Sequence, residues 1–239
     1  QKLYDDACLQ LQDFDKSHST WARIALLEAQ SDNDDIIVYK DSGESVRLPM
    51  LRQQHETAQG KPNLSLADFI VPRQLGRKDR IGIFATTVER EMENPCTEDP
   101  YRKMLAQTLC DRLAEATAEK LHADVRKKIW GYAPDENLSP QEMFQCRYTG
   151  IRPAVGYPSL PDQSINFLLD QLAGFEKIGI RLTESGAMQP HGSVSGLMMA
   201  HPKASYFSIG KIDNEQLADY AGRRGIDIEK ARKFLTANL

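Results

Sequence analysis

The segment 152–158, with the sequence RPAVGYP, combines residue types that suit recognition of a small charged ligand. Arg152 carries a planar fork of donors that matches the geometry of a carboxylate. Gly156 allows a ligand to approach the main chain closely, and Tyr157 offers a flat ring with a polar tip. The two prolines stiffen an extended backbone. A rigid loop whose arginine pairs with a neighbouring acid explains the same residues, and residue types alone favour this simpler interpretation.

Two further groups of residues have the types that a ligand site uses. Asp68 stands between apolar residues in the sequence LADFI, where it can pair with a ligand amine or cap a helix. Small hydroxyl residues alternate with apolar ones around 183–185 and 193–196, and Tyr206 and Phe207 follow. Such alternation places the hydroxyl groups on one face of a strand. An ordinary half-buried hairpin gives the same pattern.

Several common chemistries are disfavoured by what the sequence lacks. It contains no glycine-rich dinucleotide or P-loop motif, no HExxH and no GxSxG. The formal net charge of −4 disfavours a nucleic-acid surface, which needs a basic footprint. The four cysteines form no CxxC pair, which favours reduced thiols over a structural zinc site. His122 is interpreted as a packed or surface histidine rather than a metal ligand.

The length and hydropathy of the chain bound its organisation and location. Its 239 residues suit one sizeable domain, and we expect a single domain over 1–239. No apolar run approaches the roughly 20 residues that span a bilayer, and no signal peptide is visible. We therefore expect a cytoplasmic protein that does not enter a membrane.

The longest helical pattern lies near 101–130, where apolar residues recur every three or four positions without Gly or Pro. Gly131 ends this pattern. Shorter helical patterns are expected at 1–14, 50–57, 139–146, 165–172, 213–222 and 226–237. The segment 131–163 is rich in Gly and Pro and is long for a loop in a packed domain, which favours a functional role.

Strand patterns alternate with these helices. Residues 36–39 and 46–48 predict a hairpin around a polar turn that contains a glycine. Further strands are expected at 66–71, 81–86, 178–183, 194–199 and 206–209. Hairpin-connected strands between helices predict an α+β fold, with a mainly antiparallel, twisted β-sheet flanked by helices that include the long helix near 101–130.

An ordered set of short segments resembles a known family. These segments read LADFI, DRLAEATAE, KKIWGYAPDENLS, GIRPAVGYP, LTES, SVSG and HPKASYF in chain order. Together they closely resemble the C-terminal activation domain of cobalamin-dependent methionine synthase, from near residue 2 to near residue 238. WGYAP and RPAVGYP are the most specific of them. Family members commonly carry a further N-terminal portion of this domain, which we expect to be absent here.

The resemblance implies a function in reactivation of an oxidised cofactor. In this family the domain binds S-adenosylmethionine and presents its methyl group to the cobalt of cobalamin, which a partner domain holds. An electron, usually from flavodoxin, permits reductive methylation of cob(II)alamin to methylcobalamin. The protein supplies position and a shielded site, so no general acid or base and no protein-bound metal are expected. The alternatives are a docking module for the cobalamin and flavodoxin domains without ligand binding, or a stand-alone reactivator of another corrinoid protein.

The resemblance also implies roles for individual residues. Asp68 is expected to meet the amino group of the methionine part, and Arg152 its carboxylate. The backbone at Ala154 and Gly156 is expected to receive the adenosine part. Further residues near S-adenosylmethionine are expected to be Glu115, Tyr206 and Phe207.

Two residues are expected to face the cobalamin domain rather than the ligand. Tyr157 matches a residue that faces the corrin, and Asp111 matches an acid that hydrogen-bonds the cobalt-ligating histidine after it leaves the metal. Asp111 and Glu115 are four residues apart and therefore share one face of a helix. A solvated helical face explains both acids equally well from the sequence alone.

Overall fold

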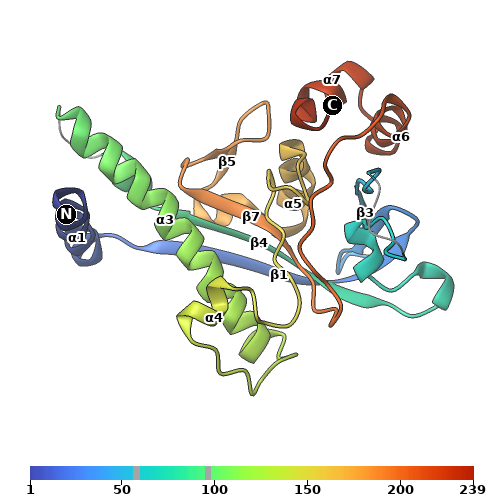
Figure 1. Cartoon of the computed structure of the whole chain (residues 1–239), viewed down its shortest axis with the longest axis horizontal. Coiled ribbons are helices and arrows are strands. Elements are labelled where there is room, and N and C mark those ends of the chain that lie inside the picture. Colours follow the sequence, from blue (N-terminus) through green and yellow to red (C-terminus); the bar gives the residue numbers. More distant parts are fainter. Residues whose placement is uncertain (56–59, 95–97) are drawn as a thin grey trace.

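A five-stranded antiparallel sheet forms the central layer of the computed structural model, which describes residues 1–55, 60–94 and 98–239 (Figure 1). The strands follow the order β3-β2-β1-β4-β7. Their bounds are Thr20–Asp32 for β1, Asp35–Tyr39 for β2, Ser45–Pro49 for β3, Asp79–Val88 for β4 and Ser193–Met198 for β7. A separate two-stranded ribbon pairs β5, Arg181–Leu182, with β6, Met188–Gln189.

Strand β4 packs against neighbouring elements on both faces of the sheet, because both of its faces are buried. Successive side chains of a strand point to opposite faces. Ile83 accordingly packs in the same cluster as Leu169, whereas Phe84 packs in the cluster that contains Ala118. The sheet is therefore packed against buried hydrophobic side chains on both of its sides.

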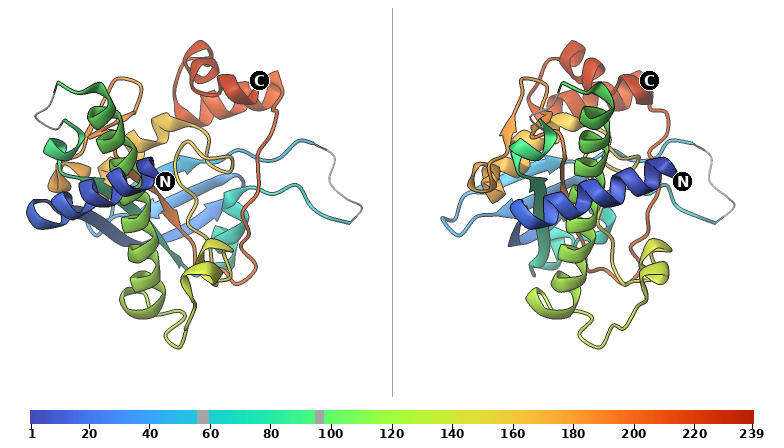
Figure 2. Two further views of the ribbon diagram at one scale, coloured as in Figure 1. Left: turned by 60° about the vertical axis from the view of Figure 1, so that its left-hand side comes forward. Right: turned by 90° about the vertical axis from the view of Figure 1, so that its left-hand side faces the viewer.

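Helices cover both faces of the sheet. The helix α3 crosses one face, where it contacts β1, β4 and β7, and α5 lies on the other (Figure 1). Figure 2 shows α1 lying across α3, which it contacts. The helix bounds are Lys2–Ser17 for α1, Arg90–Glu93 for α2, Pro100–Asp124 for α3, Pro140–Phe144 for α4, Asn166–Ala173 for α5, Asn214–Arg224 for α6 and Ile228–Phe234 for α7.

Local signals explain where α3 begins and how it ends. The Asp99 carboxylate accepts a hydrogen bond from the Tyr101 N–H, and Pro100 occupies the first helical position, where its missing N–H costs nothing. After α3 the chain continues as one π-helical turn, Val125–Ile129. Gly131 then takes a positive φ of 74°, which ends the helical path.

The α+β class, the antiparallel sheet and the long helix are confirmed. The predicted hairpin at 36–48 is β2 and β3, and 81–86 and 194–199 correspond to β4 and β7. The predicted helices at 1–14, 139–146, 165–172, 213–222 and 226–237 are also present, with shifted ends. None of the helices in the described part of the chain has the length and hydropathy to span a bilayer.

Several local predictions are wrong. The segment 66–71 is not a strand, because Ser65 and Asp68 form a capping box that starts the 3-10 helix Leu66–Phe69. Residues 50–55 are not helical, and the rest of 50–57 lies outside the described residues. The segment 206–209 joins no strand of the sheet, and 178–183 contains only the two residues of β5 after a 3-10 turn.

Candidate functional site

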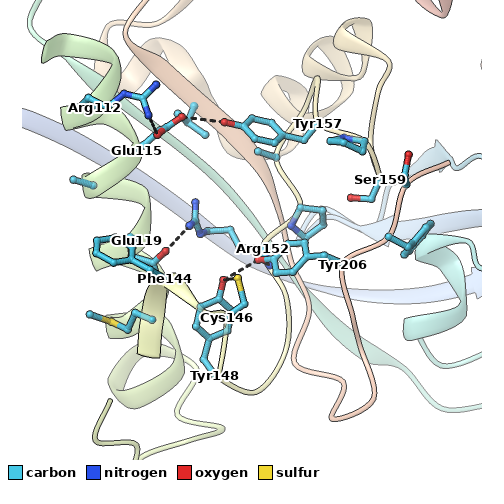
Figure 3. Close-up of a pocket in the computed structure, with 18 residues that line it drawn as sticks. Arg112, Glu115, Glu119, Phe144, Cys146, Tyr148, Arg152, Tyr157, Ser159 and Tyr206 are labelled. Carbon is cyan, nitrogen blue, oxygen red and sulfur yellow. Dashed lines mark hydrogen bonds and ion pairs between the residues drawn. The ribbon is translucent and has the colours of Figure 1, made fainter. Parts of the chain in front are cut away.

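A cavity of about 880 Å³ opens between α3, α4 and the RPAVGYP segment (Figure 3). This volume lies within the range that small-molecule ligands occupy. Acidic residues of α3 line one side, and Val194 of β7 also lines the cavity. Segment 206–208 completes the wall opposite α3.

Main-chain hydrogen bonds to β7, and to Met199 directly after it, fix the RPAVGYP segment and the preceding Ile151. The Ile151 N–H donates to the Met199 carbonyl over 3.0 Å, and the Met199 N–H returns a bond of 3.0 Å. The Val155 N–H donates to the Ser195 carbonyl over 2.9 Å. The segment comes so close to Gly196 that a Cβ there would lie 2.2 Å from the Pro153 carbonyl oxygen. Any residue larger than glycine at position 196 would therefore clash with the RPAVGYP backbone.

Arg152 pairs with an acid of α3. Its Nη2 donates to Glu119 Oε2 over 2.9 Å, and both side chains are largely buried. The alternative drawn from the sequence, in which the arginine pairs with a neighbouring acid, thus describes the geometry of Arg152. The pair is incomplete, since Arg152 Nε and Glu119 Oε1 are buried without a hydrogen-bond partner. Buried polar atoms are normally paired, so a ligand can supply the missing partners of these two atoms once the side chains separate.

A second acid on the same face of α3 meets the tyrosine of the segment. The Tyr157 hydroxyl donates to Glu115 Oε1 over 2.9 Å, and Arg112 Nη1 donates to Glu115 Oε2 over 2.9 Å. Burial, reinforced by Glu115, raises the pKa of Tyr157. This hydroxyl therefore serves as a hydrogen-bond donor at neutral pH.

An aromatic network supports the wall opposite α3. The Tyr206 hydroxyl accepts a bond of 2.8 Å from the Arg152 N–H and lies 3.0 Å from the Tyr148 hydroxyl (Figure 3). Two buried side chains contact the Tyr148 ring. The Arg126 guanidinium lies 4.4 Å from its centroid, and the His122 ring packs edge-on at 4.9 Å. Burial also raises the pKa of Tyr206, so it stays neutral.

His122 is a packed core histidine that contacts this network. Its Nε2 lies 3.3 Å from the Tyr132 hydroxyl, and its Nδ1 is buried without a partner. Burial first, and then the positive charges of Arg126 and Arg152, lower the pKa of His122 to about 2. His122 is therefore neutral in the folded state across the physiological pH range.

This depressed pKa makes the stability of the domain fall with acid. The contribution of His122 to the free energy of unfolding is fully present above about pH 6.5, the pKa of histidine in the unfolded chain. It is lost progressively below that pH, because only the unfolded state takes up the proton. At pH 5 the loss should reach about 2 kcal/mol. Urea unfolding of wild type and His122→Leu at pH 7.5 and pH 5 measures it, and the gap between the two proteins should change by that amount. His191→Leu, at a side chain that is 95% exposed, is the control; an unchanged gap for His122→Leu contradicts the assignment.

The structure brings most of the predicted ligand residues together. Lining the cavity are Glu115, Arg152, Ala154, Tyr206 and Phe207. Tyr157 also lines it. Gly156 does not line this cavity but borders a smaller hollow that adjoins it at Tyr157.

Two predicted residues lie elsewhere. The Asp68 carboxylate accepts from the Ser65 N–H over 2.8 Å and from Arg52 over 2.7 and 2.9 Å, and it lines a separate hollow. It is therefore engaged in local structure away from Arg152. Asp111 lies one turn before Glu115 on α3, half exposed, and does not line the cavity.

Sequence reasoning missed Glu119, Phe144 and Tyr148 as cavity residues. A signal for Glu119 was present, since Asp111, Glu115 and Glu119 recur every four residues and share one helical face. No comparable spacing marks the other two, which come from the segment between α3 and the RPAVGYP loop.

The sheet, the long helix across it and this cavity define an α+β domain with a cavity of the size of a small molecule. The chain matches, over residues 1–225, the family model described as "Vitamin B12 dependent methionine synthase, activation domain". The chain therefore belongs to the activation domain family of vitamin B12-dependent methionine synthase, and the resemblance drawn from the sequence is confirmed.

A solved structure shares the whole fold. It is described as "Crystal Structure of the MetH Reactivation Domain bound to AdoHcy", and it is 38% identical in sequence, with a TM-score of 0.92. The match covers 100% of this chain and 76% of that chain.

Proposed function

We propose that this chain binds S-adenosylmethionine in the cavity and thereby supports reductive methylation of oxidised cobalamin in a methionine synthase. The observation that carries the proposal is the incomplete Arg152–Glu119 pair inside an aromatic-walled cavity. The similar reactivation domain was solved with AdoHcy, which differs from S-adenosylmethionine by the methyl group on sulfur.

The chemical groups of the cavity fit this ligand. S-adenosylmethionine carries a carboxylate, an ammonium group, a sulfonium and a flat base. The buried, unpaired Nε of Arg152 suits the carboxylate. Glu115 and Glu119 present negative charge to the cationic centres, and the aromatic rings suit the base and the sulfonium. Asp68 is not part of this set, so an acid of α3 replaces it in the proposal.

The chain's contribution is position and shielding. Cobalamin, held by a partner domain, supplies the metal centre that receives the methyl group, and a flavodoxin-like protein supplies the electron. Tyr157 is half exposed at the cavity mouth, and Asp111 is half exposed on the same face of α3 as Glu115. Both are therefore accessible to a docked cobalamin domain. The residues of the cavity hold the ligand without transferring a proton.

A second candidate function is docking without ligand binding. It is favoured by one observation, that Glu119 already occupies Nη2 of Arg152. In that case the acid is a permanent structural partner, and the arginine orders the loop for a protein surface. Capture of a cobalamin domain by a folded chain that does not bind S-adenosylmethionine supports this alternative.

Arg152→Ala should weaken S-adenosylmethionine binding by about 1.5–3 kcal/mol, the range for a hydrogen bond to a charged group. Calorimetric titration measures the change, with circular dichroism as the check on folding. Methylthioadenosine, which lacks the carboxylate, should bind both proteins equally. Arg232→Ala, at an exposed arginine of α7, is the matched control. Unchanged affinity for S-adenosylmethionine in Arg152→Ala refutes the assignment of the carboxylate partner.

A further inference from the structure

Phe144 is an exposed aromatic residue at the wall of the cavity. Its side chain is 80% exposed, more than any other large hydrophobic residue in the described part of the chain. It nevertheless lines the cavity, at the end of α4. Figure 3 shows Phe144 and Tyr206 on opposite sides of Arg152. None of the ring contacts within the described residues involves Phe144.

The short helix α4 holds this ring in a defined place. At its start the Ser139 Oγ accepts from the Glu142 N–H, and Glu142 Oε2 accepts from the Ser139 N–H over 2.9 Å. Pro140 occupies the first helical position. This capping box stabilises even a five-residue helix, because it satisfies N–H groups that would otherwise lack partners.

The far end of α4 is closed as well. The Arg147 N–H donates to the Glu142 carbonyl over 3.1 Å, and the Cys146 N–H to the Met143 carbonyl over 2.9 Å. Cys146 takes the left-handed conformation with φ of 53°, which turns the chain back from the helix. Phe144 is thus presented to water by a turn that is fixed at both ends, so covering the ring requires little ordering of the backbone.

We propose that Phe144 is a specificity-determining residue whose ring stacks on the base of a nucleoside ligand. This proposal rests on the proposed function and names the part of the ligand that the α4 side of the cavity recognises. The charged groups of the ligand are complemented by three charged side chains that line the cavity, Arg152, Glu115 and Glu119. Phe144 offers only a flat apolar surface, and a base covers such a surface with its own face.

Ligands that share the base but differ in charge distinguish stacking of Phe144 on the base from a contact of Phe144 with the sulfonium. S-adenosylmethionine, AdoHcy and methylthioadenosine all carry adenosine, whereas only the first has a sulfonium and the last has no carboxylate. Phe144→Ala should weaken all three by about tenfold in calorimetric titration, the scale of one base–aromatic contact. Phe144→Trp should bind all three at least as tightly as wild type, and Phe144→Leu should lie between wild type and the alanine variant.

The controls distinguish a contact with ligand from a structural effect. Urea unfolding of Phe144→Ala should match wild type, since an exposed ring buries little area on folding. Leu75→Ala, at an exposed apolar residue outside the cavity, should leave all three affinities unchanged. A loss confined to S-adenosylmethionine overturns base stacking, because it places the sulfonium at Phe144. Equal binding by wild type and Phe144→Ala overturns it too. Failure of folded wild type to bind any of the three overturns the proposed function together with this role.

Discussion

Glu136→Ala should lower the free energy of unfolding by about 3–5 kcal/mol, because it leaves a buried guanidinium without its counter-ion. The Arg126 side chain is fully buried. Its Nε donates to both oxygens of Glu136 over 3.0 and 2.8 Å, and its Nη2 donates to Oε1 over 2.7 Å. Urea unfolding followed by circular dichroism measures the change. A loss of this size is a large part of the stability of an ordinary domain.

Two comparisons isolate the cause. Glu229→Ala removes an acid from an exposed pair on α7, which should cost less than about 1 kcal/mol. Replacing both members of the buried pair, as Arg126→Met with Glu136→Leu, should restore much of the lost stability, because no unpaired charge remains. If the single variant at Glu136 behaves like the exposed control, the buried pair does not stabilise the domain.

Gly196→Ala should destabilise the domain by about 3 kcal/mol, near the upper end of the usual cost of overpacking. The added Cβ would lie 2.2 Å from the Pro153 carbonyl oxygen and 2.8 Å from Ala154 Cα, and both are main-chain atoms. A flexible side chain could move aside, but here the RPAVGYP segment itself must shift. Since Pro153 and Ala154 line the cavity, the variant should also bind S-adenosylmethionine more weakly.

Thermal or urea unfolding and calorimetric titration test both parts of this prediction. The matched control is Gly222→Ala on α6, where an added Cβ meets nothing within 4 Å. That change should be neutral or stabilising by up to about 1 kcal/mol, since alanine favours a helix more than glycine does. Wild-type stability and affinity in Gly196→Ala would show that the segment does not depend on its close approach to β7.

The sequence was most informative where hydrophobic periodicity was strong. The long helix was recognised because apolar residues recur over many turns without Gly or Pro. The longest strand, Thr20–Asp32, was missed although it forms the centre of the sheet. Its first nine residues are exposed or half-buried, so they lack a clear alternation of period two. The strand predicted at 66–71 failed because two capping hydrogen bonds outweigh the β-propensity of a short apolar run.

The site was partly predictable for a similar physical reason. Arg152 and Ala154 belong to one continuous segment, so a motif places them together. Glu119 pairs with Arg152 across 33 positions of sequence. Residue types predict an acidic partner for this arginine, but local spacing does not identify which acid it is. Asp68 shows the converse case. The resemblance predicts a ligand amine as its partner, whereas in the structure a local N–H and Arg52 donate to its carboxylate.

The pairing of the RPAVGYP segment with β7 also covers one edge of the sheet. Strand β7 is the last strand in the order of the sheet, and an outermost strand exposes unpaired N–H and C=O groups that another chain can join. Here the Leu197 N–H donates to the Pro153 carbonyl over 3.0 Å, and bonds from Ile151 and Val155 occupy further positions. The RPAVGYP segment therefore also covers the edge of the sheet, which disfavours intermolecular strand addition and aggregation.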